Sequence, residues 1–134
     1  MTFTLVDSNV ILDALDENER WYDWSTTALR ASGDMGVLVI NPIIYAEVSV
    51  RFASAADAEA ALTDQLFHRD PLPWEAAFLA GKAYLAYRRR GGARPSVMPD
   101  FYIGAHAAVR GFRLLTRDAS RYRTYFPTVE LVSP

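Results

Sequence analysis

Short, continuously apolar runs alternate with longer segments of helical periodicity along this chain of 134 residues. Runs of this kind are typical of strands that are buried on both faces of a parallel sheet. Parallel strands need crossover connections, and helices usually supply them. The alternation therefore predicts an α/β fold: one domain over residues 1–134, with a four- to five-stranded, mainly parallel sheet wrapped by helices.

The expected strands are residues 2–6, 37–40, 112–115 and 129–132. A weaker strand is expected near residues 66–72, where Pro71 and Pro73 confine it to a sheet edge because proline cannot donate to the ladder. Helices are expected over residues 9–15, 19–32, 42–52, 55–67, 74–90 and 100–110. Pro42 suits the first turn of one helix, and Gly33 and Gly111 are expected to end two others.

Composition narrows the classes of function. The chain has no cysteine, which excludes disulfides, zinc–thiolate sites and thiol catalysis. No apolar run reaches the roughly 18–20 residues that a membrane span requires, so we expect no membrane partner. Absence of cysteine and of a signal-peptide pattern favours a cytoplasmic location.

Charge is unevenly distributed. Residues 1–67 carry eleven acidic side chains against three arginines, and residues 68–134 carry five acidic against eleven basic side chains. This asymmetry indicates an anionic partner for one surface and cations or a basic partner for another. Blocks of charge are also common on solvated faces without any partner, and that alternative stays open here.

Four carboxylates fall at corresponding places relative to these elements. Asp7 ends the first strand, and Glu47 lies about one turn into the helix that follows the second strand. Asp100 begins the helix that leads into the strand at residues 112–115, and Asp118 follows that strand. Ligands of open parallel sheets bind beyond the carboxyl ends of the strands. Clustered carboxylates repel one another, and a hard cation such as Mg²⁺ or Mn²⁺ is the natural counter-charge.

Each carboxylate also has a simpler interpretation. Asp7 and Asp118 could cap the helices that follow them, and Asp100 could be an ordinary first-turn acid favoured by the helix dipole. Glu47 could form a surface ion pair with Arg51, four residues further along its helix. A shared metal site explains all four positions together.

The basic half of the chain supplies candidate phosphate contacts. We expect them from the arginines near the end of the helix at residues 74–90 and beside Asp118: Arg88, Arg89, Arg90, Arg94 and Arg117. Arginine can grip a phosphate with two parallel hydrogen bonds. Cations at a helix C-terminus also suit its dipole, which is the alternative interpretation of the first three.

Histidine chemistry is not expected. Acid–base catalysis without a metal typically relies on a pair of histidines. The chain has only His68 and His106, in unrelated contexts, and we interpret both as structural. We therefore expect chemistry at the four carboxylates to be metal-assisted.

Four stretches of the chain resemble the PIN-domain nucleases, and within them the VapC-type toxins of bacterial toxin–antitoxin pairs. The stretches are Val6-Asp7-Ser8-Asn9-Val10, Tyr45-Ala46-Glu47-Val48, Pro99-Asp100-Phe101-Tyr102-Ile103-Gly104-Ala105-His106-Ala107 and Leu114-Leu115-Thr116-Arg117-Asp118. The resemblance spans essentially the whole chain.

This resemblance implies a parallel sheet wrapped by helices, Mg²⁺ or Mn²⁺ in an acidic pocket and endonuclease action on RNA. With two unrelated histidines, a metal-free route through the 2′-hydroxyl is not expected, so the products should be a 5′-phosphate and a 3′-hydroxyl. It also implies a cognate antitoxin and a homodimer. The implied catalytic and metal-binding residues are Asp7, Glu47, Asp100 and Asp118, supported by Asn9 and Thr116.

Three other functions remain to be weighed against a nuclease toxin. A phosphoacceptor receiver domain needs paired acids after its first strand and a lysine after its fifth, whereas this chain has the single Asp7 and only Lys82, within a helix. A binding module without activity would have little use for four unpaired carboxylates. The same nuclease chemistry could also serve RNA processing, and an antitoxin gene directly upstream would favour the toxin.

Overall fold

The computed structural model describes all 134 residues, and its centre is a five-stranded sheet in the order β3-β2-β1-β4-β5. Every neighbouring pair is parallel. The strands are β1 (Thr2–Val6), β2 (Gly36–Ile40), β3 (His68–Arg69), β4 (Arg113–Leu115) and β5 (Leu131–Val132). The predicted α/β class is confirmed, and the weak edge strand is present as β3.

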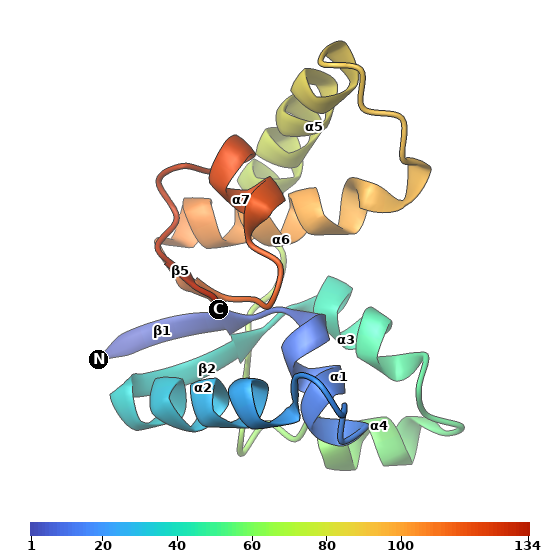
Figure 1. The fold of residues 1–134 in the computed structure, drawn as a ribbon, viewed down its shortest axis with the longest axis vertical. Helices are drawn as coiled ribbons and strands as arrows, with labels where there is room; N and C mark the ends of the chain where they lie inside the picture. The colour runs from blue at the N-terminus through green and yellow to red at the C-terminus, as the bar shows by residue number, and fades with distance from the viewer.

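Seven α-helices and one 3₁₀-helix connect the strands. They are α1 (Ser8–Leu15), α2 (Tyr22–Met35), α3 (Pro42–Ser49), α4 (Ala55–Ala61), α5 (Trp74–Arg89), η1 (Pro95–Val97), α6 (Met98–Arg110) and α7 (Ser120–Tyr125). In Figure 1, α1 and α2 lie on one side of the sheet, and α6 and α7 lie on the other, with α5 projecting beyond α6. None of these helices has the length and apolar content needed to cross a membrane.

The strand order reverses next to β1. The chain passes from β1 to β2 on one side and later returns to β4 on the other side, with Leu5 aligned with both Val39 and Leu114. Crossovers that run in opposite directions leave a crevice at the carboxyl ends of the two central strands. The residues that follow β1 and β4 therefore lie at the place where this architecture binds ligands.

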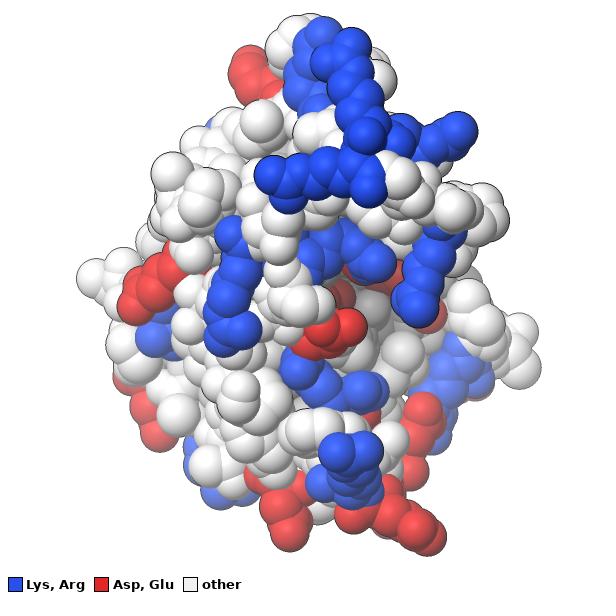
Figure 2. Space-filling view, turned by 45° about the horizontal axis from the view of Figure 1, so that its top comes forward, with Lys and Arg blue, Asp and Glu red and all other residues white.

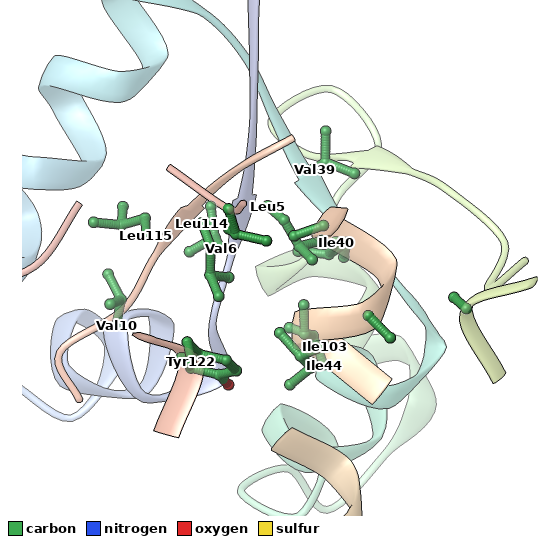
Figure 3. Packing of buried hydrophobic residues seen from close by; sticks show 14 of the residues in the cluster. Leu5, Val6, Val10, Val39, Ile40, Ile44, Ile103, Leu114, Leu115 and Tyr122 are labelled. Carbon is green, nitrogen blue, oxygen red and sulfur yellow. The ribbon is translucent and has the colours of Figure 1, made fainter. Parts of the chain in front are cut away.

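Apolar side chains from both layers enclose the central strands. Leu5, Val6 and Leu114 are fully buried, as expected for strands covered on both faces. Figure 3 shows Tyr122 of α7 close to Val10 of α1, at the end of this core nearest the carboxyl ends of the strands. The core therefore holds the elements that carry the four carboxylates in fixed relative positions.

Several predicted boundaries are wrong. Helix α2 continues through Gly33 to Met35, because the chain enters β2 directly from the helix at Gly36. A Cβ atom at Gly36 would lie 1.9 Å from the carbonyl oxygen of Thr2, so only glycine permits this pairing with β1. Helix α4 ends at Ala61, six residues earlier than expected, because the backbone amide of Phe67 bonds to the Thr63 carbonyl in a separate turn.

Candidate active site

Asp7 is the buried member of the acidic group. It directly follows β1, its side chain is 4% exposed, and it makes no capping hydrogen bond to α1. Its Oδ2 instead accepts hydrogen bonds of 2.9 Å from the Thr116 hydroxyl and 2.9 Å from the Tyr122 hydroxyl. The cap interpretation of Asp7 is therefore wrong, since the side chain is oriented by β4 and α7 rather than by its own helix.

The second oxygen of Asp7 is less well satisfied. Its one side-chain contact is long, 3.5 Å from the Ser8 hydroxyl, which also lies 3.0 Å from Glu47 Oε1. A serine hydroxyl carries one proton, and the shorter contact to Glu47 takes it. A hydrogen bond from the Ser8 backbone lowers the pKa of Asp7 slightly, so Oδ1 is a weakly satisfied acceptor for which a cation would be a stronger partner.

Three of the four acids line one hollow of about 220 Å³ beyond the ends of β1 and β4. Its lining residues are Asp7, Ser8, Asn9, Asp100, Asp118, Arg121 and Tyr122. Figure 2 shows acidic atoms in a hollow near the middle of this face, with basic side chains on several sides of it. The structure thus brings together acids that are 111 positions apart along the chain, from Asp7 to Asp118.

Glu47 joins this group from α3 without lining the hollow itself. It contacts the hollow through Ser8, whose hydroxyl donates to it. Arg51, the alternative partner expected from spacing, pairs with Asp16 instead and donates from Nη2 to the Leu15 carbonyl. The ion-pair interpretation of Glu47 is therefore wrong.

The charges of these acids influence one another. Burial raises the pKa of Asp7, and Asp100 raises it further, while the hydroxyls of Thr116 and Tyr122 oppose the rise. Burial raises the pKa of Glu47 as well, and the charges of Asp7 and Asp100 add to that rise. Burial also raises the pKa of Asp100, against the effect of Arg121. In the protein without a cation, this region therefore carries more negative charge than its surroundings stabilise.

Asn9 and Thr116 connect β1 and β4 around Asp7. Asn9 donates from Nδ2 to Thr116 Oγ1 at 3.4 Å and accepts the backbone N–H of Arg117 at 3.2 Å. The Thr116 hydroxyl, which donates to Asp7, also accepts the backbone N–H of Asp118 at 3.2 Å. These bonds fix the loop after β4 and, with it, the position of Asp118.

Two residues at the hollow, Arg121 and Tyr122, were not found from the sequence. Arg121 donates from Nη1 to Asp100 Oδ2 at 2.5 Å, and Tyr122 donates to Asp7. Burial and the neighbouring carboxylates raise the pKa of Tyr122 well above its ordinary value, so the hydroxyl keeps its proton and remains a donor. The available signal was position, because both residues lie in the first turn of the short helix that follows Asp118.

Arg117 was expected to be free to contact a phosphate, but its guanidinium pairs with Asp13. Its Nε and Nη2 donate to the two oxygens of Asp13 at 2.9 and 3.0 Å, and its guanidinium lies 5.5 Å from the Trp21 ring. Asp13 is only 2% exposed and also accepts from the Ser25 hydroxyl. The sequence signal for this partner was again helical spacing, since Asp13 lies four residues after Asn9.

The other predicted phosphate contacts lie outside the hollow. Arg88 and Arg89 end α5, and Arg90 and Arg94 belong to the segment between α5 and η1. Arg88 donates to the Tyr84 hydroxyl at 3.2 Å. Their phosphate-binding role stays a prediction.

His106 lies in a buried network on the far side of α6. Asn41 uses its Oδ1 to accept the Ile44 N–H, so its amide nitrogen, 2.9 Å from His106 Nδ1, must donate to that ring nitrogen. The proton of the neutral ring is then on Nε2, which donates to Asp70 Oδ2 at 2.7 Å. This arrangement agrees with the structural interpretation of His106, while His68 lies on the edge strand β3.

A hard divalent cation fits this donor set. All candidate ligands are carboxylate oxygens, as Mg²⁺ and Mn²⁺ prefer, and Asp7 Oδ1 is a weakly satisfied acceptor among them. No group of three acidic or histidine side chains is already placed to ligate one ion. Arg121 competes most directly with a cation shared by these acids, because it already pairs with Asp100.

Comparison with known proteins agrees with this architecture. Residues 4–127 match the family described as PIN domain. Among solved structures, the fold resembles chains of VapBC2 from Rickettsia felis, with a TM-score of 0.74 and 14% identity over 98% of each chain. It also resembles VapBC-1 from nontypeable Haemophilus influenzae, with a TM-score of 0.74 and 15% identity over 98% of each chain.

A third similar structure is FitAB bound to the IR36 DNA fragment, with a TM-score of 0.62 and 22% identity over 98% of this chain and 94% of that one. No curated protein matches the chain by sequence. The match over residues 4–127 includes β4, the last three residues of β1 and the carboxylates that follow these strands. This chain belongs to the PIN domain family.

Proposed function

We propose that this protein is a Mg²⁺- or Mn²⁺-dependent endoribonuclease and the toxin of a toxin–antitoxin pair. The observation that carries the proposal is the hollow at the strand-order reversal, where Asp7, Asp100 and Asp118 meet and Glu47 is joined through Ser8. Membership of the PIN domain family supports the nuclease chemistry, and it removes the receiver-domain alternative.

In this proposal the four carboxylates hold the cation, and Asn9 and Thr116 keep Asp7 and the loop after β4 in position. When bound, a divalent cation supplies an activated water and positive charge at the phosphate. The protein's own contribution is to orient the acids. Tyr122 and Thr116 bind Asp7 Oδ2 and so fix which oxygen faces the site. The products are a 5′-phosphate and a 3′-hydroxyl.

The partners follow from the similar structures. These are described as VapBC complexes, FitAB and a toxin–antitoxin complex from Klebsiella pneumoniae. We infer that this chain binds a cognate antitoxin, forms a homodimer and acts in the cytoplasm. The arginines Arg88, Arg89, Arg90 and Arg94 would then contact RNA phosphates away from the scissile bond.

The test is cleavage of single-stranded RNA by the purified protein with Mn²⁺, with Mg²⁺ and with excess EDTA. We expect cleavage only with the cations, and none from the Asp100→Asn variant. Wild-type protein should arrest growth when expressed alone, and co-expression of the neighbouring antitoxin should restore it. Undiminished cleavage in EDTA, or growth arrest by a folded Asp100→Asn protein without nuclease activity, would contradict the proposal.

A further inference from the structure

Arg121 is the one basic side chain among the residues that line the acidic hollow. It lies in the first turn of α7, three positions after Asp118. Its side chain is 24% exposed, so it is neither a core residue nor a freely solvated one. A cation in this place has two possible uses, as a structural partner of Asp100 or as a contact for an anionic ligand.

Most of its hydrogen-bonding capacity is unused. A guanidinium has five N–H donors, and Arg121 commits one of them, from Nη1 to Asp100. No buried side-chain nitrogen in the protein lacks a partner, so the unused donors are open to solvent. The guanidinium also lies 5.7 Å from the centre of the Tyr87 ring, which holds it against α5 independently of Asp100.

A phosphodiester that enters this hollow meets several carboxylates, which repel it. A divalent cation in the site would take the Asp100 carboxylate, because opposite charges and oxygen ligands favour that exchange. The guanidinium, still held by Tyr87, would then face the anion with its donors free. Arginine suits this contact because it can bind two phosphate oxygens at once.

We propose that Arg121 is a phosphate-binding residue of the active site, which Asp100 holds until a divalent cation replaces it. This inference rests on the proposed nuclease function and adds a substrate contact to it. Arg121 competes with the cation for Asp100, but it attracts the RNA phosphate, as the cation does. Removal of Arg121 should therefore strengthen cation binding and weaken RNA binding.

A second arginine continues this surface away from the hollow. The guanidinium of Arg90 lies 5.6 Å from the Tyr125 ring, and Tyr125 packs edge-on against Tyr87 at 6.2 Å. Arg90 and Arg121 thus lie on one aromatic surface formed by α5 and α7. Arg90 has no carboxylate partner there, so it is expected to contact an adjacent phosphate without affecting the cation.

The first measurement is calorimetric titration of the metal-free protein with Mn²⁺ and no RNA. We expect Arg121→Ala to bind Mn²⁺ about fivefold more tightly than wild type, because a partly exposed ion pair no longer competes for Asp100. Arg121→Lys should lie between the two. Arg90→Ala and the control Arg123→Ala, on the outer part of α7, should bind Mn²⁺ like wild type.

The second measurement is kcat/KM for a single-stranded RNA in saturating Mn²⁺ at several salt concentrations. Arg121→Ala should lose about tenfold or more. The negative slope of log kcat/KM against log salt concentration should become shallower by about 0.7, the value for one phosphate contact on a single strand. Arg90→Ala should make the slope similarly shallower, and Arg123→Ala should change neither kcat/KM nor the slope.

Tighter Mn²⁺ binding together with weaker RNA cleavage supports the proposal. If Arg121→Ala weakens both, the residue only holds α7 against α6, and the proposal is wrong. Wild-type values for both would also overturn it. Failure of the nuclease function itself is distinct, because wild type would then neither bind Mn²⁺ nor cleave RNA.

Discussion

Tyr122 provides a sharp test of the geometry around Asp7, because a single oxygen can be removed without changing the packing. The side chain is 2% exposed, and its hydroxyl donates to Asp7 Oδ2 at 2.9 Å. In Tyr122→Phe the ring remains, but a nearly buried carboxylate loses one of its two short donors. A hydrogen bond to a charged group contributes about 1.5–3 kcal/mol, so we expect the free energy of unfolding to fall by about 2 kcal/mol at pH 7.

The measurement is urea-induced unfolding in EDTA, with thermal melts as a second readout. A loss of this size corresponds to a fall in Tm of roughly 6–10 °C for a domain of this length. Tyr125→Phe is the matched control, since Tyr125 lies on the same helix and its hydroxyl makes no hydrogen bond with the protein. The control should stay within about 0.5 kcal/mol of wild type.

The pH dependence of this difference is also fixed in sign. The Tyr122 hydroxyl lowers the pKa of Asp7, so its removal raises the folded-state pKa further above the ordinary 3.8. A raised carboxyl pKa destabilises the folded state only where the unfolded chain is ionised, and this penalty grows as pH rises above the ordinary value. The difference between wild type and Tyr122→Phe should therefore shrink as the pH is lowered from 7 to 4. Equal stability at pH 7, or the same difference at both pH values, would refute the reasoning.

Three further variants test other parts of the structure by urea unfolding. Arg117→Ala should lower the free energy of unfolding by about 2 kcal/mol, because it leaves the buried Asp13 without its bidentate partner. A loss below about 0.5 kcal/mol, as for an ordinary surface substitution, would contradict this. Gly104→Ala should cost about 1–3 kcal/mol, since its Cβ would lie 2.3 Å from the buried Phe126 ring; a neutral effect would show that the ring can move. Burial lowers the pKa of His106 below its ordinary 6.5, against the effect of Asp70. The folded protein therefore holds this proton less tightly than the unfolded chain does, so the stability that neutral His106 provides is complete above pH 6.5 and is lost as the pH falls below it. His106→Gln should thus lose less stability between pH 7 and pH 5 than wild type, and an unchanged slope would contradict this.

The sequence was sufficient for the architecture because hydrophobic pattern and turn residues agree along most of the chain. The run at residues 2–6 ends in the apolar pair Leu5 and Val6 and became the central strand, which is buried on both faces from Thr4 onward. Boundaries were harder. Gly33 is a typical helix stop, yet α2 passes through it because the register of β2 against Thr2 requires the close approach at Gly36. This constraint comes from a strand more than 30 residues away, so nothing in the sequence around Gly33 indicates it.

The site could be predicted in part for a similar reason. Acids that follow strands are placed by topology, so Asp7 and Asp118 could be located from the order of elements alone. Their hydrogen-bond partners depend on how α7 returns across the sheet, and the sequence gives only the spacing of Arg121 and Tyr122 from Asp118. Arg117 was assigned by proximity in sequence, whereas the direction of its side chain is decided by a buried acid on α1.

The central claim is that the four carboxylates form one cation site. The direct measurement is the thermal stability of wild type and of four single variants with and without Mn²⁺: Asp7→Asn, Glu47→Gln, Asp100→Asn and Asp118→Asn. A ligand at one hundred times its Kd stabilises a protein by about 2.7 kcal/mol, which for this length corresponds to a rise in Tm of roughly 8–13 °C. Wild type should show such a rise and each variant much less. Asp64→Asn, an exposed acid that lines a different hollow, should respond like wild type. A wild-type protein whose Tm ignores Mn²⁺, or an Asp64→Asn protein that loses the response as the four variants do, would contradict a shared site.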